Sequence, residues 1–116
     1  MSPQSVKRDR TIKDRATLER TLKTGAVVRS LYFRMCYIAG SGPPKIAFLA
    51  GRRVGGAVRR NRAKRVLREV YRTSDVDVSG IETLVFVATG RIVDANHTAV
   101  RQAAIDALTR ASGDGN

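Results

Sequence analysis

The most regular pattern of apolar and polar positions lies between residues 58 and 72. Almost all of the polar positions in this stretch are basic. The apolar side chains recur at i, i+3, i+4, i+7 and i+8, which is the spacing of one face of an α-helix: Ala63, Val66, Leu67, Val70 and Tyr71. An amphipathic helix is therefore predicted from Val58 to Arg72, with one face in the core and the opposite face cationic.

A second, shorter helix is predicted near the start of the chain. Asp14 or Thr17 can cap it, because short polar side chains accept hydrogen bonds from the free N–H groups of a first helical turn. Leu18 and Leu22 follow at i, i+4 and share one face. Gly25 is expected to end the helix in the left-handed conformation, which glycine adopts at low cost.

A strand and a last helix are predicted in the C-terminal third. The run 83–89 is rich in branched residues and has the pattern of a strand buried on both faces. Asn96 then caps a helix that Gly113 should stop. The residues expected to face inward are Val100, Ala103, Ala104, Ala107, Leu108 and Ala111.

Two more strands are predicted between the first two helices. Residues 31–39 and 45–50 are rich in aromatic and branched side chains, and the segment 40–44 between them ends in two prolines, which cannot join a β-ladder. The two strands are expected to be antiparallel. Residues 27–30 either form a further strand or lead into the first one.

The order of these elements, α-β-β-α-β-α with one further strand if 27–30 forms one, predicts an α+β two-layer sandwich. In this arrangement the helices pack against one face of a mixed sheet. The 116 residues are sufficient for one domain over 1–116 with a core of its own. Residues 1–9 and 113–116 are expected to be loosely held.

The distribution of charge along the chain gives the first indication of its function. Lys and Arg number 22 against 10 Asp and Glu, so the net charge is +12. Residues 1–51 carry 10 basic and 3 acidic groups, 52–72 carry 9 and 1, and 73–116 carry 3 and 6. Because the excess is concentrated around the predicted central helix, it indicates a binding face for a polyanion, and nucleic acid is the commonest one.

Several other classes of protein are excluded or disfavoured by the same sequence. No apolar run approaches the ~20 residues of a membrane-spanning helix, and the basic N-terminus is not followed by the apolar stretch of a secretory signal, so a cytoplasmic protein is expected. Cys36 is the only cysteine and His97 the only histidine, which predicts no disulfide and no metal site. The carboxylates are scattered without a paired spacing, and His97 is expected to lie exposed at a helix start, so no catalytic residue is predicted.

The densest motif is the segment 51–69. Three glycines precede the helix, and arginine, whose planar fork makes two parallel hydrogen bonds to a phosphate, outnumbers lysine. The run Gly55-Gly56-Ala57-Val58-Arg59-Arg60-Asn61-Arg62-Ala63-Lys64-Arg65-Val66-Leu67-Arg68-Glu69 closely resembles the signature of the bacterial ribonuclease P protein subunit. The resemblance extends over most of the chain.

The resemblance implies a fold and a partner. The fold is that of the ribosomal protein S5 domain 2-like group, with αβββαβα order, a mixed four-stranded sheet and a left-handed βαβ crossover. The protein would bind the catalytic RNA of ribonuclease P, without needing a protein partner. The residues implied for that contact are Arg52, Arg53, Arg59, Arg60, Asn61, Arg62, Lys64, Arg65 and Arg68.

The resemblance also implies a second surface, a cleft between the first helix and the sheet that holds the single-stranded 5′ leader of precursor tRNA. The residues implied here are Leu18, Leu22, Phe33, Arg34 and Tyr37. Family members commonly carry phenylalanines where this chain has Leu18 and Leu22, so ring stacking on leader bases would be lost there. Because strand residues alternate, Phe33 and Tyr37 point to one face and Arg34 to the other, and the sequence leaves open which face lines the cleft.

The implied activity is an endoribonuclease whose catalytic centre lies in the RNA subunit. Mg²⁺ would be held mainly by that RNA, and the protein would assist removal of the leader. Two alternatives remain at this stage. A small ribosomal or general RNA-binding protein would share the charge and the fold class, whereas a DNA-binding domain would need more neutral base-reading residues than Asn61 alone.

Overall fold

The computed structural model describes residues 10–113 of the chain. The predicted loosely held ends therefore lie outside the described residues, except Gly113, which is the last residue of the final helix. The elements in chain order are α1 (Arg15–Thr24), β1 (Ala26–Arg29), β2 (Phe33–Ala39), β3 (Lys45–Ala50), the 3₁₀ turn η2 (Arg52–Val54), α2 (Ala57–Thr73), β4 (Ile81–Ala88), the 3₁₀ turn η3 (Gly90–Ile92) and α3 (His97–Gly113).

The four strands form one mixed sheet in the order β1-β2-β4-β3. β2 pairs antiparallel with β1 and with β4, whereas β3 and β4 are parallel. Residues 27–30 therefore do open a strand. The strands at 31–39 and 45–50 run in opposite directions, as predicted, but they do not pair with each other, because β4 lies between them.

β4 takes this central position because it carries the longest run of fully buried residues. Residues 83–86 are all buried, which requires a neighbouring strand on each side and cover on both faces. The loop after β2 packs against the start of β4 instead of turning back into a hairpin, and the Gly40 N–H donates to the Gly80 carbonyl at 3.0 Å. β3 is displaced to the far edge of the sheet.

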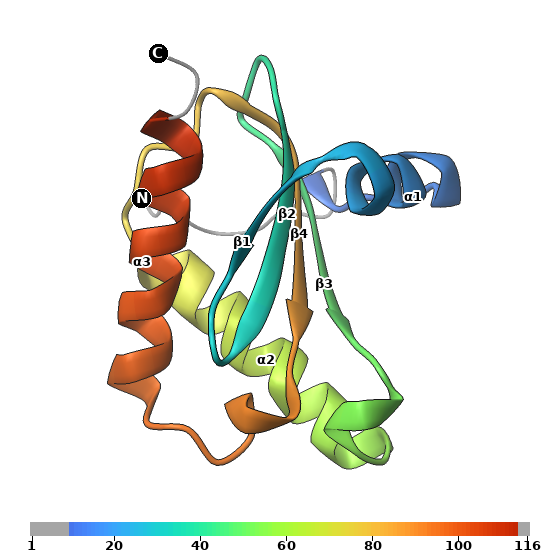
Figure 1. Ribbon diagram of the computed structural model, residues 1–116, viewed down its shortest axis with the longest axis vertical. Coiled ribbons are helices and arrows are strands. Elements are labelled where there is room, and N and C mark those ends of the chain that lie inside the picture. Colours follow the sequence, from blue (N-terminus) through green and yellow to red (C-terminus); the bar gives the residue numbers. More distant parts are fainter. Residues whose placement is uncertain (1–9, 114–116) are drawn as a thin grey trace.

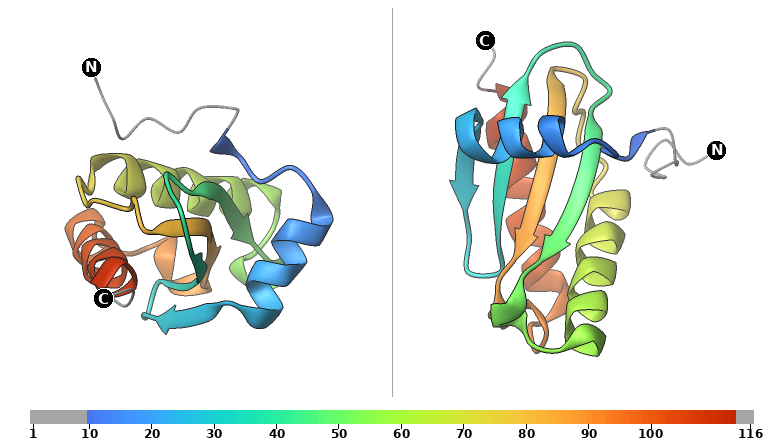
Figure 2. Two further views of the ribbon diagram at one scale, coloured as in Figure 1. Left: turned by 90° about the horizontal axis from the view of Figure 1, so that it is seen from above. Right: turned by 90° about the vertical axis from the view of Figure 1, so that its right-hand side faces the viewer.

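The helices cover both faces of the sheet (Figures 1 and 2). α2 and α3 pack on one face over the main core, which includes Phe33, Phe86 and Leu108. α1 packs on the other face over a smaller cluster that includes Cys36 and Val85. The α+β class and the mixed four-stranded sheet are confirmed, and the placement of all helices on one face is wrong for α1. No helix among residues 10–113 is long and apolar enough to cross a bilayer.

The β3–α2–β4 unit is a left-handed crossover. Seen from the α1 side, both strands run downward, β4 lies to the left of β3, and α2 packs on the opposite face (Figure 2, right). Roughly 98% of parallel βαβ connections are right-handed, so general rules alone predict the other hand. The left-handed path places α2 beside the edge strand β3, where its outer face is open.

α1 begins and ends close to the predicted residues. The Asp14 carboxylate accepts from the Thr17 backbone N–H at 2.9 Å and from its hydroxyl at 2.6 Å, and these bonds hold the pKa of Asp14 below its ordinary value. Gly25 ends the helix in an extended conformation with φ −72°, so the predicted left-handed cap is wrong. Glycine is needed there because a Cβ would lie 2.5 Å from the Thr21 carbonyl oxygen and 2.7 Å from that of Tyr37.

Candidate nucleic-acid interface

α2 separates its residues into a buried face and a charged face, as its sequence pattern predicts. Ala63, Leu67, Val70 and Tyr71 are buried, and Val66 is partly buried against the same core. The helix begins one residue earlier and ends one residue later than predicted. Burial of the apolar face orients the helix, so the opposite face must point to solvent.

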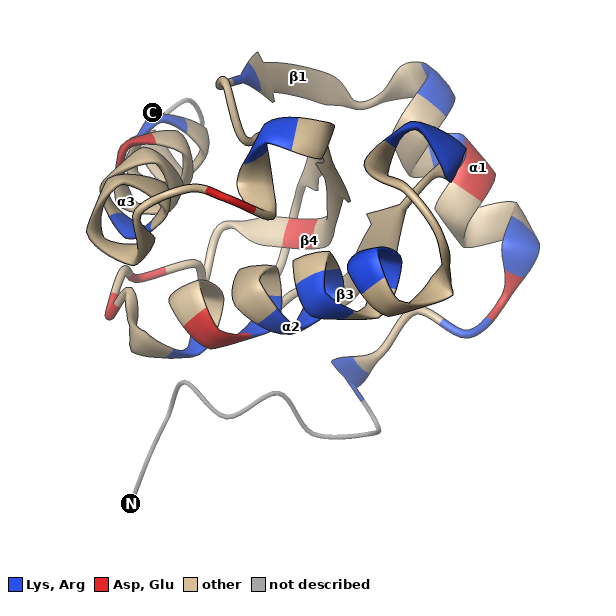
Figure 3. Ribbon diagram, turned by 90° about the horizontal axis from the view of Figure 1, so that it is seen from below, with Lys and Arg blue, Asp and Glu red and all other residues tan. Residues whose placement is uncertain are grey.

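The nine residues predicted to bind RNA lie on η2 and α2 and are here called the basic ridge; Figure 3 colours the Lys and Arg positions of these segments blue. Arg60 and Lys64 are half-buried, and the other seven are exposed. The members of the ridge are Arg52, Arg53, Arg59, Arg60, Asn61, Arg62, Lys64, Arg65 and Arg68.

Within residues 10–113, no cation of the basic ridge is paired with a carboxylate. The ion pairs in this part of the chain join Arg72 to Glu69 and Arg20 to Glu82. Glu69 is the only acid on α2, and its bond to Arg72 keeps the pKa of this carboxyl below its ordinary value. The positive potential of the ridge is therefore uncompensated, which favours the binding of a polyanion.

Arg59 also shapes the loop that leads into α2. Its Nε donates to the Val54 carbonyl at 3.0 Å, so the side chain folds back over the turn. Gly55 lies beneath it with φ +133°, a conformation that side chains rarely adopt, and a Cβ there would be 2.6 Å from Arg59 Cδ. Gly55 is thus required by both its backbone angle and its neighbour.

We expect Gly55→Ala to lower the free energy of unfolding by about 1–3 kcal/mol, because the new methyl group strains the backbone and displaces Arg59. Urea denaturation followed by circular dichroism measures this change. Gly51→Ala is the matched control, since a Cβ at Gly51 meets nothing within 4 Å, and it should change stability by less than about 1 kcal/mol. Equal losses in the two variants would contradict the role of Gly55.

A second surface, here called the α1-side surface, lies where α1 crosses the sheet. Leu18 and Leu22 of α1 are half-buried and pack on a small apolar cluster of the sheet. The buried members of this cluster are Ile12, Cys36, Ala47 and Val85, and its partly buried members also include Leu49 and Val87. The buried hydroxyls of Thr21 and Thr83, 2.8 Å apart, help to hold α1 on β4. The surface is apolar at its centre, and Glu82 lies beside α1, where it pairs with Arg20 at 3.1 Å.

Two arginines lie on the same face of the sheet, beyond α1. Arg29 and Arg34 are directly opposite each other on β1 and β2. Arg34 Nε is buried and has no hydrogen-bond partner among the described residues, and neither arginine has an ion pair there. Like charges opposite each other on neighbouring strands are destabilising, so this pair favours a bound anion.

The structure places the residues predicted to bind the leader on two different faces of the sheet. Arg34 lies on the α1 side, whereas Phe33 and Tyr37 point to the other face, where they are buried in the main core with 0% and 4% of their surfaces exposed. Neither ring can line the α1-side surface. Arg29 was not among the residues predicted from the sequence, although alternation within 27–30 places it beside Arg34 once that segment is known to be a strand.

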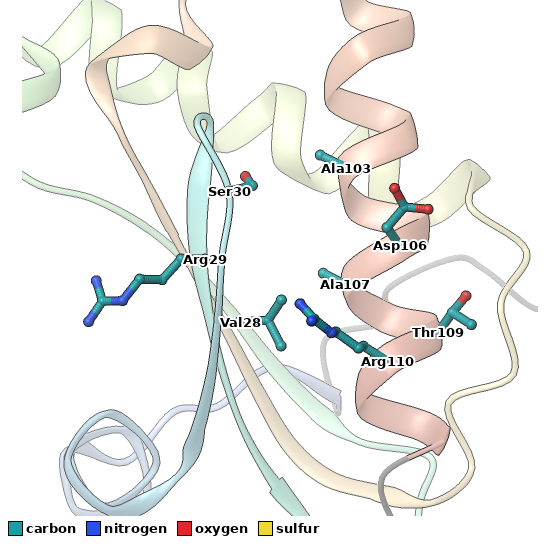
Figure 4. A pocket seen from close by; sticks show the side chains of 8 residues that line it. All are labelled: Val28, Arg29, Ser30, Ala103, Asp106, Ala107, Thr109 and Arg110. Atoms are coloured by element: carbon teal, nitrogen blue, oxygen red, sulfur yellow. The ribbon is translucent and has the colours of Figure 1, made fainter.

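A pocket of about 440 Å³ lies on the opposite side of β1, against α3 (Figure 4). Val28 points toward α3, and Ala103 and Ala107 line the pocket from the helix, whereas Arg29 points away from α3. None of the site residues predicted from the sequence lines it. No residue of the basic ridge lines the pocket, and Arg29 is the lining residue that also belongs to the arginine pair on the α1 side.

His97 and Asp77 lie at a helix start and in a turn, respectively. His97 is exposed at the first residue of α3, as predicted, and the Asn96 side chain accepts from the Thr98 N–H at 2.8 Å to cap the helix. Asp77 accepts from the Ser79 N–H at 3.0 Å in a turn. Among residues 10–113, no group of three His, Cys, Asp or Glu side chains lies close enough to hold a metal ion.

The fold and the basic ridge together define a small α+β protein with a cationic surface suited to a polyanion. Residues 6–112 match the family model described as Ribonuclease P. A protein of Nitratiruptor sp. named "Ribonuclease P protein component" is 34% identical over 100 residues, covering 86% of this chain and 90% of that protein. A protein of the same name from Thermoanaerobacter sp. is 29% identical, covering 75% and 77%. The chain therefore belongs to the ribonuclease P protein family.

Solved structures agree in fold. The ribonuclease P protein of Thermotoga maritima superposes with a TM-score of 0.74 at 22% identity, covering 86% of this chain and 96% of that one. The Staphylococcus aureus protein gives 0.70 at 20% identity, covering 87% and 94%. The same architecture is thus kept at low sequence identity.

Proposed function

We propose that this chain is the RNA-binding protein subunit of ribonuclease P and assists the Mg²⁺-dependent endonucleolytic removal of 5′ leaders from precursor tRNA. The observation that carries the proposal is the basic ridge, whose cations have no acidic partner among the described residues. Family membership supplies the identity of the polyanion, the RNase P RNA. The ridge binds its phosphates through the forked guanidinium groups of arginine.

The chemistry of cleavage is assigned to the RNA subunit. Among residues 10–113, no group of three His, Cys, Asp or Glu side chains could hold a metal ion. We assign Mg²⁺ to the RNA because the family resemblance implies it and because phosphates supply the oxygen ligands that Mg²⁺ prefers. The protein contributes by lowering the electrostatic repulsion between two polyanions and by orienting the substrate.

The α1-side surface is assigned to the leader. Arg29 and Arg34 provide charge for its phosphates, and the apolar centre beside Leu18 and Leu22 contacts its bases. Leucine offers bases only apolar contact, whereas an aromatic ring adds stacking worth about 1–3 kcal/mol per base. The leader contact is thus expected to depend on charge more than on stacking.

We expect Leu22→Phe to tighten binding of precursor tRNA by about fivefold, because the half-buried position on α1 would gain a stacking ring. Mature tRNA, which lacks the leader, should bind the variant and the unaltered protein equally. Leu31→Phe is the control, since Leu31 is 61% exposed and lies outside the α1-side surface. A gain of the same size for mature tRNA would contradict the assignment.

Reconstitution tests the proposed function directly. We expect the purified chain, added to a bacterial RNase P RNA at low Mg²⁺, to restore 5′ cleavage of precursor tRNA that the RNA alone performs poorly. The rate is measured with 5′-labelled substrate over a range of Mg²⁺ concentrations. An equally basic protein from outside the family is the control for charge screening, and equal rescue by both would refute the proposal.

A further inference from the structure

A pocket of about 230 Å³ lies at the outer edge of β3, where the basic ridge and the α1-side surface meet. It lies between the segment before α1, the edge strand and α2, with Thr11, Ile12, Phe48, Leu49 and Arg68 among its lining residues. Sites for drug-sized ligands are roughly 300–1,000 Å³, so this pocket suits a single small ring system. No acidic residue lines it.

Phe48, one of the lining residues, carries a ring that its neighbours hold in position. The Phe48 ring is stacked on Phe86, with centroids 5.8 Å apart and planes at 12°, and meets Tyr71 edge-on at 6.1 Å. The guanidinium carbon of Arg68 lies 5.5 Å from the centre of the Phe48 ring. Arg68 is exposed and has no hydrogen bond or ion pair with another described residue. Its planar fork is free to bind a further partner.

The backbone of β3 adds a donor and an acceptor at the same place. The Ile12 N–H donates to the Ile46 carbonyl at 2.9 Å, so the backbone groups of Ile46 point away from β4. Because these groups alternate along a strand, the N–H and C=O of Phe48 also point outward. The bridge to Thr11 is at Ile46, and no described segment pairs with β3 at Phe48.

A ligand that matches these features has a flat face, a hydrogen-bonding edge and an adjacent negative charge. An unpaired nucleotide has all three: the base stacks on the arginine and ring wall, its edge bonds the strand, and its phosphate meets the guanidinium. The pocket also lies between the two RNA surfaces, since Arg68 belongs to the basic ridge and Leu49 to the α1-side surface.

We propose that the pocket at the outer edge of β3 binds the base of one unpaired nucleotide of RNA, with Arg68 holding its phosphate. This rests on the proposed function. The nucleotide comes either from the RNase P RNA bound along α2 or from the leader as it leaves the α1-side surface, and the experiment distinguishes these sources.

Photocrosslinking of the assembled holoenzyme tests the pocket. In one arm the RNase P RNA carries 5-iodouridine, and in the other only the leader of precursor tRNA carries it. We expect a crosslink at Phe48, located by mass spectrometry, in one of the two arms. At saturating RNA, Arg68→Lys should lower its yield at least fivefold, because lysine keeps the charge but loses the planar contact with the ring. Arg72→Lys, one turn further along α2 and outside the ridge, should leave the yield within twofold.

Removing the base at the crosslinked nucleotide completes the test. An abasic residue keeps the phosphate, so its introduction should weaken RNA binding about fivefold to tenfold with an unchanged salt dependence. Two results would refute nucleotide binding in the pocket and leave the proposed function standing. In the first, the holoenzyme forms and cleaves but gives no crosslink to residues 45–50. In the second, the abasic residue causes no loss of RNA affinity. A chain that forms no holoenzyme overturns both.

Discussion

Replacing Arg62 and Arg65 together by alanine is expected to lower the affinity for RNase P RNA by about 100-fold near physiological salt. Both side chains are exposed on the basic ridge and have no acidic partner among the described residues. Each lost arginine–phosphate contact costs about tenfold. The dependence of log K on log salt should fall by about 1.8, because two fewer counterions are released on binding. Filter binding at several salt concentrations measures both quantities.

Arg110→Glu is the matched control for this double variant. It also lowers the net charge by two, but Arg110 is exposed on α3, away from the ridge. We expect less than a threefold loss of affinity and an unchanged salt slope. If both variants lose affinity equally, binding follows net charge alone and the ridge is not the interface. Stability should not change in the double variant, since alanine favours exposed helical positions.

The helices and the basic ridge could be predicted from the sequence because both follow from local patterns. The periodicity at 63–71 determines which face of α2 is buried, and the charged residues on the remaining positions then have to be exposed. The residues of the basic ridge could therefore be predicted without knowing the order of the strands in the sheet. For the same reason the Asn96 cap and the inward residues of α3 were correctly predicted, including Ala103, which is partly buried against the core.

The sheet order could not be predicted in the same way. Two strands adjacent in sequence favour a hairpin, yet β4, contributed by residues 81–88, inserts between β2 and β3. This arrangement depends on the burial of both faces of β4 and on α2 returning over the sheet, which are non-local interactions. The left-handed crossover came only from the family resemblance, since general rules favour the other hand.

The residues of the α1-side surface could not be predicted from the alternation of residues in β2, because this alternation fits either face of the sheet equally well. β2 alternates between two sets of residues, and both sets contain groups able to contact RNA. Burial by α2 and α3 selects Phe33 and Tyr37 for the main core, which leaves Arg34 on the α1 side. A one-residue shift in register exchanges the two faces, so the residues of this surface depend on tertiary packing.

The largest loss of stability is expected from Phe86→Ala, which should lower the free energy of unfolding by about 3–5 kcal/mol. Phe86 lies at the centre of β4 and is fully buried. Its ring packs against three others, with centroids 5.3 Å from Phe33, 5.8 Å from Phe48 and 6.2 Å from Tyr71. Loss of a large buried ring leaves a cavity and also removes aromatic contacts worth about 0.5–1.5 kcal/mol each.

The same ring cluster joins α2 to the sheet, because Phe86 on β4 packs against both Tyr71 on α2 and Phe48 on β3. We therefore expect Phe86→Ala to weaken RNA binding as well, although Phe86 touches no solvent. Phe86→Leu is the control and should destabilise less than Phe86→Ala, since it loses the same ring contacts but leaves a much smaller cavity. Urea denaturation and RNA binding are measured on both variants. Phe86→Ala could lose stability as expected and still bind RNA with unchanged affinity at temperatures where it is folded. This result would mean that α2 keeps its position without the ring cluster. The loop before α2 and the Arg59 bond to Val54 would then hold the basic ridge in place.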